Sequence, residues 1–177
     1  TGDLRPMRIA IVGNSGSGKS TLAADLARTH DLAALDLDTV AWEPEKIAVP
    51  REPKQALAQV RTFCTTRPQW VVEGCYAGLI QAALPHASLL LFLDPGVHAC
   101  IANCHSRPWE PHKFKSPEEQ DRHFALLLEW VQAYYRRNGD ASLREHQSLF
   151  DAFDGPKQRL TGRASAQSIG ELSLQPG

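Results

Sequence analysis

Short apolar runs alternate along this chain with longer segments in which apolar residues recur at helical spacing. Nearly continuous apolar runs are typical of strands buried on both faces of a parallel sheet, and the helical spacing is typical of amphipathic helices. The segment 118–137 shows that spacing most clearly, at Phe124, Leu127, Leu128 and Val131. The alternation predicts an α/β fold, a five-stranded parallel sheet with helices on both faces. The predicted strands are 7–12, 33–37, 70–73, 88–94 and 157–161, and the predicted helices are 19–29, 52–65, 77–84, 96–105, 118–137 and 141–153.

Length and composition fit a single domain, which we expect to span residues 7–161. The chain has 177 residues, 42% hydrophobic and 22% charged, and is long enough to bury a sizeable core. Residues 106–117 are polar, contain proline and interrupt the pattern, so we expect a mobile surface loop there. Because Met7 is the only methionine, residues 1–6 are expected to be a tag remnant. The weakly patterned residues 162–177 are expected to form a partly disordered tail.

A glycine-rich motif joins the first predicted strand to the first predicted helix. It fits G-x-x-x-x-G-K-[ST], and a strand before it and a helix after it are the setting in which this motif forms a phosphate-binding loop. Its backbone N–H groups are expected to face the β-phosphate of ATP. We expect Lys19 to reach the β- and γ-phosphates and Ser20 to bind Mg²⁺. The predicted ATP-binding residues are Gly13, Asn14, Ser15, Gly16, Ser17, Gly18, Lys19, Ser20 and Thr21.

Acidic residues stand at the ends of the second, third and fourth predicted strands. In an open α/β sheet, the ligand crevice lies at the carboxyl ends of the strands. Asp36 and Asp38 follow the second strand, Glu73 ends the third and Asp94 ends the fourth. Each can hold Mg²⁺, directly or through water, or accept a proton from an attacking hydroxyl. The alternative, a cap for a following helix, stays open for all of them. It has more weight for Asp94, which precedes a predicted helix, than for Asp38 or Glu73, after which no clear helix start follows.

Charge and cysteine content narrow the classes of partner. A net charge of −1 leaves no basic surface for nucleic acid and no polybasic patch for a membrane, and no apolar run is long enough to span one. The four cysteines are expected to be reduced thiols in the cytoplasm. Cys100, Cys104 and the neighbouring His105 have the spacing to begin a zinc site, but no second cysteine pair follows, so buried apolar thiols are favoured. We expect a small-molecule partner and a monomer or homodimer.

Several segments make the chain resemble the P-loop small-molecule and nucleoside monophosphate kinases. Among these kinases it most resembles the adenylate-kinase-related group often labelled DNA topology modulation proteins. The resemblance is carried by 13–21, 35–42, 70–76 and the helix with Phe124, Leu128, Trp130, Tyr134 and Arg136.

The resemblance implies roles for individual residues. Asp38 matches the aspartate beside the acceptor hydroxyl, which makes it the implied base or orienting group. Glu73 matches the acid that holds Mg²⁺, usually through water, and Ser20 and Asp36 complete the expected magnesium ligands. Residues 106–117 fall where the lid lies. The implied catalytic residues are Lys19, Asp38, Arg107 and Arg136, with Arg137 as a further candidate for a phosphate contact.

The predicted acceptor side is acidic. From His30 to Pro50 the chain has no arginine, and Lys46 is its lysine. A kinase that phosphorylates a nucleotide must bind an anionic acceptor, normally through arginines, and Cys75, Tyr76 and Ala77 stand where a nucleoside monophosphate kinase offers one. A neutral or cationic acceptor is therefore favoured, with an aminoglycoside-type amino sugar as the sharpest hypothesis, unless the acids are simply solvated. The acids in this stretch are Asp31, Asp36, Asp38, Glu43 and Glu45.

Three functions stay open. The favoured one is an ATP-dependent kinase that phosphorylates a hydroxyl of a small neutral or cationic molecule, and the second is a nucleoside or nucleotide kinase. A lid at 106–117 favours either, because it would exclude the water that otherwise hydrolyses ATP. The third is a regulatory P-loop ATPase switch, for which the chain shows no appended domain or repeat. A preference for ATP over GTP is not decided by the sequence.

Overall fold

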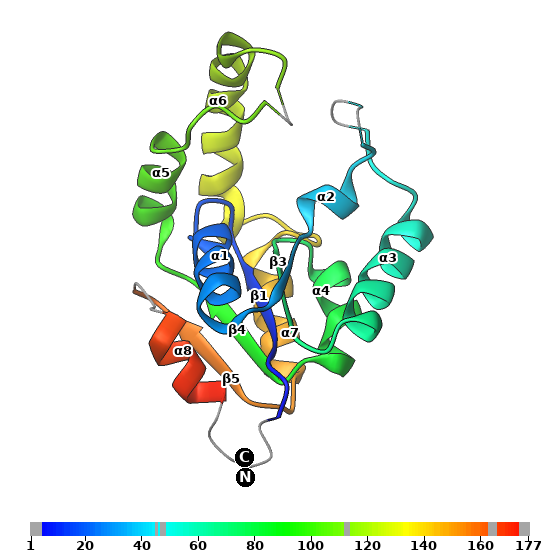
Figure 1. Ribbon diagram of the computed structural model, residues 1–177. Coiled ribbons are helices and arrows are strands. Elements are labelled where there is room, and N and C mark those ends of the chain that lie inside the picture. The colour runs from blue at the N-terminus through cyan, green and yellow to red at the C-terminus, as the bar shows by residue number, and fades with distance from the viewer. Residues whose placement is uncertain (1–4, 45, 47–48, 112–113, 163–165, 174–177) are drawn as a thin grey trace.

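Five parallel strands form one sheet in the order β2-β3-β1-β4-β5 (Figure 1). The computed structural model describes residues 5–44, 46, 49–111, 114–162 and 166–173. Every predicted strand is present, with each end within one residue of its predicted position, so the predicted α/β fold is confirmed. The strands are β1 (Arg8–Gly13), β2 (Ala33–Asp36), β3 (Trp70–Gly74), β4 (Leu89–Leu93) and β5 (Lys157–Leu160).

The predicted helices are present too, and one of them is divided. The segment predicted as a single helix over 118–137 forms α6 and then a 3-10 turn, η2, that ends at Tyr135. The longer helices are α1 (Lys19–His30), α3 (Pro53–Thr66), α5 (Val97–His105), α6 (Pro117–Gln132) and α7 (Leu143–Ala152). The shorter elements are α2 (Asp38–Ala41), α4 (Ala77–Ala83), η1 (Leu84–His86), η2 (Ala133–Tyr135) and α8 (Ala166–Ser173).

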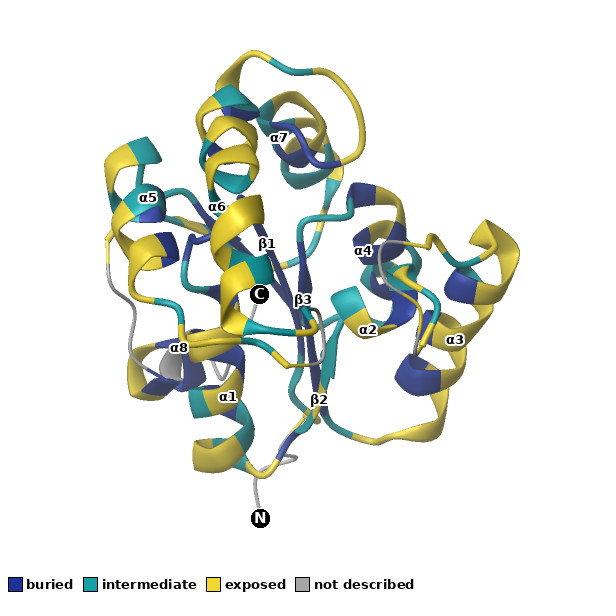
Figure 2. Ribbon diagram, turned by 90° about the horizontal axis from the view of Figure 1, so that it is seen from above, coloured by how far each residue is buried: buried dark blue, intermediate teal, exposed yellow. Residues whose placement is uncertain are grey.

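Different helices cover the two faces of the sheet. Ile9 and Ile11 of β1 pack with α1 and α8, whereas Ala10 and Val12 pack with α3 and α4. The faces alternate because successive side chains of a strand point to opposite sides. Figure 2 shows β1 and β3 buried at the centre, with the exposed surfaces of the helices around them. Burial on both faces explains why these strands are almost entirely apolar.

The short helix α2 lies where the sequence pattern predicted none. Its four residues are too few to show a helical period, and burial of Leu37 and Val40 in the core fixes it instead. The carboxylate of Asp36 accepts a hydrogen bond from the backbone N–H of Asp38 (2.9 Å), which satisfies a donor of its first turn. The expectation that no helix start follows Asp38 is therefore wrong.

Residues 166–173, part of the tail that was expected to be partly disordered, form helix α8. Ile169 is 1% exposed and packs in the core cluster that contains α1. The ring nitrogen Nε2 of His30, at the end of α1, is hydrogen bonded to the carbonyl of Ala166 (3.1 Å). Apolar burial and this bond attach the helix to the domain. Residues 163–165 and 174–177 of the predicted tail lie outside the described residues, as do 1–4 of the expected tag remnant.

The carboxyl ends of the strands meet at one edge of the sheet, and different helices stand on the two sides of this edge. Helices α5 and α6, with the described parts of the connection between them (106–111 and 114–116), stand on one side of it, and α2 stands on the other (Figure 1). Residues 112 and 113 of the predicted lid lie outside the described residues. Among the helices that the structure describes, none combines the length and apolar character needed to cross a membrane.

Replacement of Ile169 by Ala tests whether α8 is part of the folded domain. We expect it to lower the free energy of unfolding by about 2–4 kcal/mol, because a buried branched side chain is lost and a cavity is left behind. Urea denaturation of the whole chain measures the change. The control is Gln167→Ala, an exposed position on the same helix; equal stability of the two variants would contradict the packing of α8 on α1.

Candidate active site

The glycine-rich motif forms the turn between β1 and α1. Gly16 and Gly18 have positive φ angles of 79° and 94°, which favour glycine. A Cβ on Gly16 would also lie 2.4 Å from the carbonyl oxygen of Cys100 in α5, so the loop backbone approaches α5 too closely for any side chain. No side chain caps α1 and no acid stands in its first turn. The N-terminus of α1 thus has the geometry and dipole of an anion-binding site.

Lys19 lies inside this loop. Only 8% of its surface is exposed. Its ammonium donates hydrogen bonds to the carbonyl oxygen of Asn14 (2.6 Å) and to the hydroxyl of Ser17 (3.4 Å). The charge is therefore held over the loop whose N–H groups would face a phosphate.

Ser20 links the loop to the end of β3. Its hydroxyl donates to Oε1 of Glu73 (3.1 Å). Glu73 is 4% exposed and lies opposite Ile11 of β1 and Asp36 of β2 in the register of the sheet. The predicted magnesium ligands Ser20, Glu73 and Asp36 therefore come from adjacent chain segments at one edge.

The carboxyl of Glu73 is electrostatically perturbed. Burial raises its pKa to about 7, and the neighbouring charge of Asp36 adds to the rise. The charge of Lys19 and the hydrogen bond from Ser20 act in the opposite direction. Glu73 therefore exchanges its proton near neutral pH, as a ligand that binds a cation in its ionised form can do.

The donor set fits Mg²⁺ better than zinc. Within the part of the chain that the structure describes, no three His, Cys, Asp or Glu side chains are grouped to hold a metal ion by themselves. A hydroxyl and one or two carboxylates suit Mg²⁺, which keeps several waters and takes further ligands from phosphates. Cys100 and Cys104 are buried in a cluster with Val131, as favoured above, and burial raises the pKa of the Cys100 thiol to about 11.

Asp38 lies near Glu73, at the start of α2. The hydroxyl of Tyr76 donates to its Oδ1 (2.6 Å), and the indole N–H of Trp42 donates to the Tyr76 oxygen (3.0 Å). Burial and the charge of Asp38 raise the pKa of Tyr76, so its hydroxyl stays protonated and serves as a donor. Tyr76 and Trp42 belong to the motifs that carry the resemblance, but the sequence did not predict the bond from Tyr76 to Asp38 or the bond from Trp42 to Tyr76.

Arg51 is a second contributor that sequence reasoning missed. Its guanidinium lies against the end of α2, with Nη2 3.5 Å from the carbonyl oxygen of Thr39 and 3.4 Å from that of Trp42. A cation at this position satisfies carbonyls at a helix C-terminus. Its Nε is buried and makes no hydrogen bond among the described residues. Arg51 follows directly after the acidic stretch 30–50, so it was not among the residues from which a neutral or cationic acceptor was predicted. Glu45 belongs to that stretch and lies outside the described residues.

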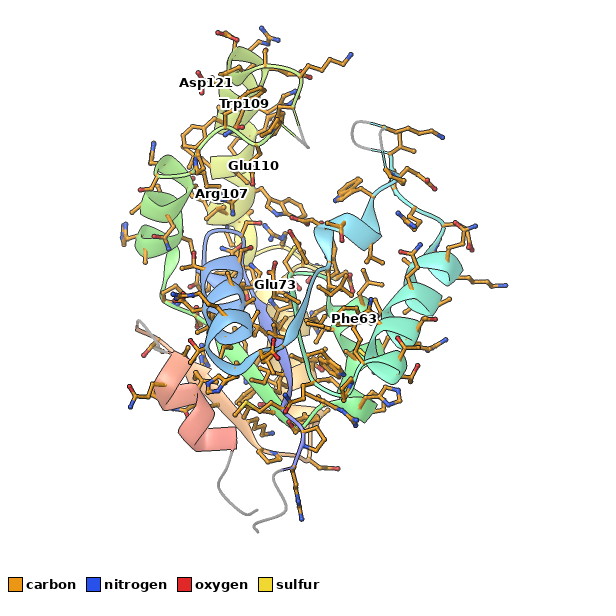
Figure 3. All side chains as sticks on the ribbon, in the orientation of Figure 1. Phe63, Glu73, Arg107, Trp109, Glu110 and Asp121 are labelled. Carbon is orange, nitrogen blue, oxygen red and sulfur yellow. The ribbon has the colours of Figure 1, made fainter. Side chains whose placement is uncertain are left out.

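The candidate lid arginines differ in what surrounds them. Arg107 is half-buried after α5, and Figure 3 shows it with Glu110 on the side of α5 and α6, above Glu73. Arg136 is exposed after η2. Arg137 stacks on the ring of Trp130 (3.6 Å to its centroid) and donates to the carbonyl oxygens of Trp130 and Ala141. Arg137 therefore holds the end of α6 in this structure.

Asp94 does not cap the helix that follows it. Helix α5 has no side-chain cap, and the Asp94 carboxylate accepts hydrogen bonds from the hydroxyl of Tyr135 (2.9 Å) and from the guanidinium of Arg159. These contacts tie β4 to β5 and η2. The capping interpretation is wrong.

Buried polar contacts hold the loop after β3. Nε2 of His146 lies 2.7 Å from the carbonyl oxygen of Cys75, and its Nδ1 lies 2.7 Å from the hydroxyl of Tyr134. A carbonyl can only accept, so Nε2 carries the proton and Nδ1 accepts from Tyr134. Burial lowers the pKa of His146 to about 4, which keeps the ring neutral.

The structure is similar to solved structures of several kinases. A gluconokinase from Sinorhizobium meliloti 1021 has a TM-score of 0.53 at 17% identity, with 96% of this chain and 90% of that chain covered. A sugar kinase from Janibacter sp. HTCC2649 has a TM-score of 0.51 at 16% identity, over 96% and 93%. A shikimate kinase from Aquifex aeolicus vf5 has a TM-score of 0.52 at 16% identity, over 95% and 96%. No family model and no curated protein matches the chain. The likeness shows an α/β P-loop NTPase fold.

Replacement of Glu73 by Gln tests the buried carboxyl. Its raised pKa means that the folded chain keeps a proton between about pH 4.5 and 7 that the unfolded chain releases, so ionisation of Glu73 destabilises the nucleotide-free fold as pH rises through this window. We therefore expect Glu73→Gln to gain at least about 2–4 °C in Tm over the wild type between pH 5 and pH 8, the shift that 1 kcal/mol produces at this chain length.

Thermal unfolding at the two pH values, without nucleotide or metal, measures this gain. Glu118→Gln, the same substitution at an exposed position of α6, is the control and should show no such gain. A Tm difference for Glu73→Gln that is the same at both pH values would contradict the raised pKa.

Proposed function

We propose that the chain is an ATP-dependent kinase that phosphorylates a hydroxyl of a small molecule. The observation that carries the proposal is the placement of Asp38 beside the Ser20–Glu73 pair, on the acceptor side of the phosphate loop. Phosphoryl transfer needs a phosphate-binding loop with a lysine, groups that can bind Mg²⁺, and a separate carboxylate for the acceptor. The fold is shared with solved structures of a gluconokinase, a sugar kinase and a shikimate kinase, which supports the proposal.

In the proposed reaction, the loop and Lys19 bind the β- and γ-phosphates of ATP. Ser20 and Glu73, with Asp36 nearby, would hold Mg²⁺, which would supply neutralisation of charge on the phosphates. The acceptor hydroxyl forms its bond to the γ-phosphorus as the bond to the leaving ADP oxygen breaks, and Asp38 takes the hydroxyl proton. Arg107 and Arg136 are the proposed phosphate contacts from the lid side, and residues 106–117 are the proposed lid.

The proposed acceptor is a neutral or cationic hydroxyl compound, and an amino sugar of the aminoglycoside type is the most specific form of this proposal. The carboxylate of Asp38 would repel an anionic acceptor and attract an ammonium group. Arg51 is the observation that favours the second candidate, a nucleoside or nucleotide kinase, because it brings to α2 a guanidinium whose buried Nε makes no hydrogen bond among the described residues. A regulatory ATPase switch would need no acceptor-side carboxylate, so Asp38 favours a kinase over a switch.

Lys19→Ala tests the phosphate loop. We expect ATP turnover to fall by at least about a hundredfold, because a charge that stabilises the transition state is removed. Release of ADP in the presence of Mg²⁺ measures it. Lys54→Ala, an exposed lysine at the start of α3, is the control and should retain wild-type turnover. Wild-type turnover by Lys19→Ala would overturn the assignment of the loop.

A panel of acceptors tests the reaction and its substrate class together. The protein is incubated with ATP, Mg²⁺ and, in turn, AMP, CMP, a neutral sugar, a sugar acid and a set of aminoglycosides. Mass spectrometry detects the gain of one phosphoryl group. We expect transfer to a neutral or amine-bearing compound, because the acids at the acceptor side disfavour an added anion. Transfer to AMP or CMP alone would support the nucleotide kinase, and ATP hydrolysis with no transfer to any of a broadened set would support the switch.

A further inference from the structure

A hydrogen-bond chain of fixed direction ends on Asp38. The indole N–H of Trp42 can only donate, so the Tyr76 oxygen accepts from it at 3.0 Å. The Tyr76 hydroxyl has a single proton, which it donates in a hydrogen bond to Oδ1 of Asp38 (2.6 Å). Trp42 and Asp38 are on either end of α2, whereas Tyr76 follows β3. The chain therefore joins two separate segments of the acceptor side.

The backbone on both sides of Tyr76 is fixed independently of Asp38. The carbonyl of Cys75 accepts from the buried ring of His146 (2.7 Å), and the N–H of Ala77 donates to the carbonyl of Asp140 (3.1 Å). His146 is completely buried. The Tyr76 hydroxyl thus projects from a segment that the region around α7 holds in place.

The backbone of Asp38 is fixed by other groups. Its N–H donates to the carboxylate of Asp36 (2.9 Å), and the N–H of Leu37 donates to the carbonyl of Glu73 (2.9 Å). These bonds set where α2 begins and involve only the main chain of Asp38 and Leu37. The bond from Tyr76 acts on the carboxylate of Asp38 itself, so its removal is expected to change the side chain and to leave the main chain in place.

We propose that Tyr76 is a positioning residue for Asp38 and that Trp42 in turn orients Tyr76. This inference rests on the proposed kinase function. A short bond to a carboxylate oxygen restricts the side chain to one orientation, and a base fixed in its reactive orientation loses no rotamer freedom when the acceptor hydroxyl arrives. Tyr76 acts only through Asp38 and takes no proton itself.

Tyr76→Phe removes the hydroxyl and keeps the ring. We expect kcat for the acceptor found in the panel to fall by about ten- to a hundredfold, the range for losing a hydrogen bond to a charged group. The KM for the acceptor and the affinity for a non-hydrolysable ATP analogue should each change by less than about twofold, because the binding contacts stay in place.

Tyr135→Phe is the matched control. Tyr135 also donates its hydroxyl to an aspartate, Asp94, at the end of a strand, at 2.9 Å. The two variants lose the same kind of bond, so a general loss of stability would affect both. We expect Tyr135→Phe to keep kcat within about twofold of the wild type.

A double-mutant cycle separates positioning from a structural role. In an Asp38→Asn background, Tyr76→Phe should lower the residual transfer rate by less than about twofold, since the group through which Tyr76 acts is gone. Trp42→Phe should lower kcat by a smaller factor than Tyr76→Phe in the wild-type background, and by less than about twofold once Tyr76 is Phe.

The outcomes are distinguishable from those of the proposed function. Active wild-type protein with an equally active Tyr76→Phe variant would overturn the positioning role alone. A fall in kcat that is the same with Asp38 and with Asn at position 38 would overturn it too, because Tyr76 would then act elsewhere. A wild-type protein that phosphorylates no acceptor would overturn the proposed function and this inference together.

Discussion

The pairing of β1 with its neighbours places the phosphate loop and the carboxylates of Glu73 and Asp36 at one edge of the sheet. β1 is the central strand, and its last residue, Gly13, opens the phosphate loop. Its register with β3 sets Ile11 opposite Glu73, and the register of β3 with β2 sets Glu73 opposite Asp36. A slip by one residue would exchange the faces of Val72 and Glu73 and bury the carboxyl among the apolar side chains of α3 and α4. The apolar core that fixes this register therefore also assembles the site.

Ionisable groups buried at this edge favour the binding of a metal ion but lower the stability of the nucleotide-free fold. Glu73 and Lys19 are both almost fully buried, and the charge of Asp36 raises the pKa of Glu73 further. A carboxyl that holds its proton to about pH 7 costs stability when it ionises. A cation bound beside it would favour the ionised form and release that proton, so binding of Mg²⁺ and ionisation of Glu73 would be coupled. The same burial that lowers the free energy of unfolding without nucleotide would strengthen the binding of the metal ion.

The sequence predicted the parts of this protein that depend on local patterns. Apolar runs gave the strands, and the motif from Gly13 to Thr21 predicted the loop between β1 and α1, because both signals lie in consecutive residues. Helix α2 has too few residues for a period, and α8 follows a weakly patterned segment. The bond from Tyr76 to Asp38 joins residues 38 positions apart, and no local pattern encodes it. Arg136 and Arg137 show the same limit, since the stacking of Arg137 on Trp130 depends on how the end of α6 turns.

The phosphate loop is bonded to the helices that carry the proposed lid. The side chain of Asn103 in α5 donates to the carbonyl of Gly16 (2.7 Å), and that of Asn14 donates to the carbonyl of Val131 in α6 (3.1 Å). Gly16 also lies against the backbone of Cys100, where no Cβ would fit. Close-packed contacts of this kind transmit a displacement because they cannot be compressed. A change in the position of the loop would therefore shift α5 and α6 as well, so these helices would respond if a phosphate were bound at the loop.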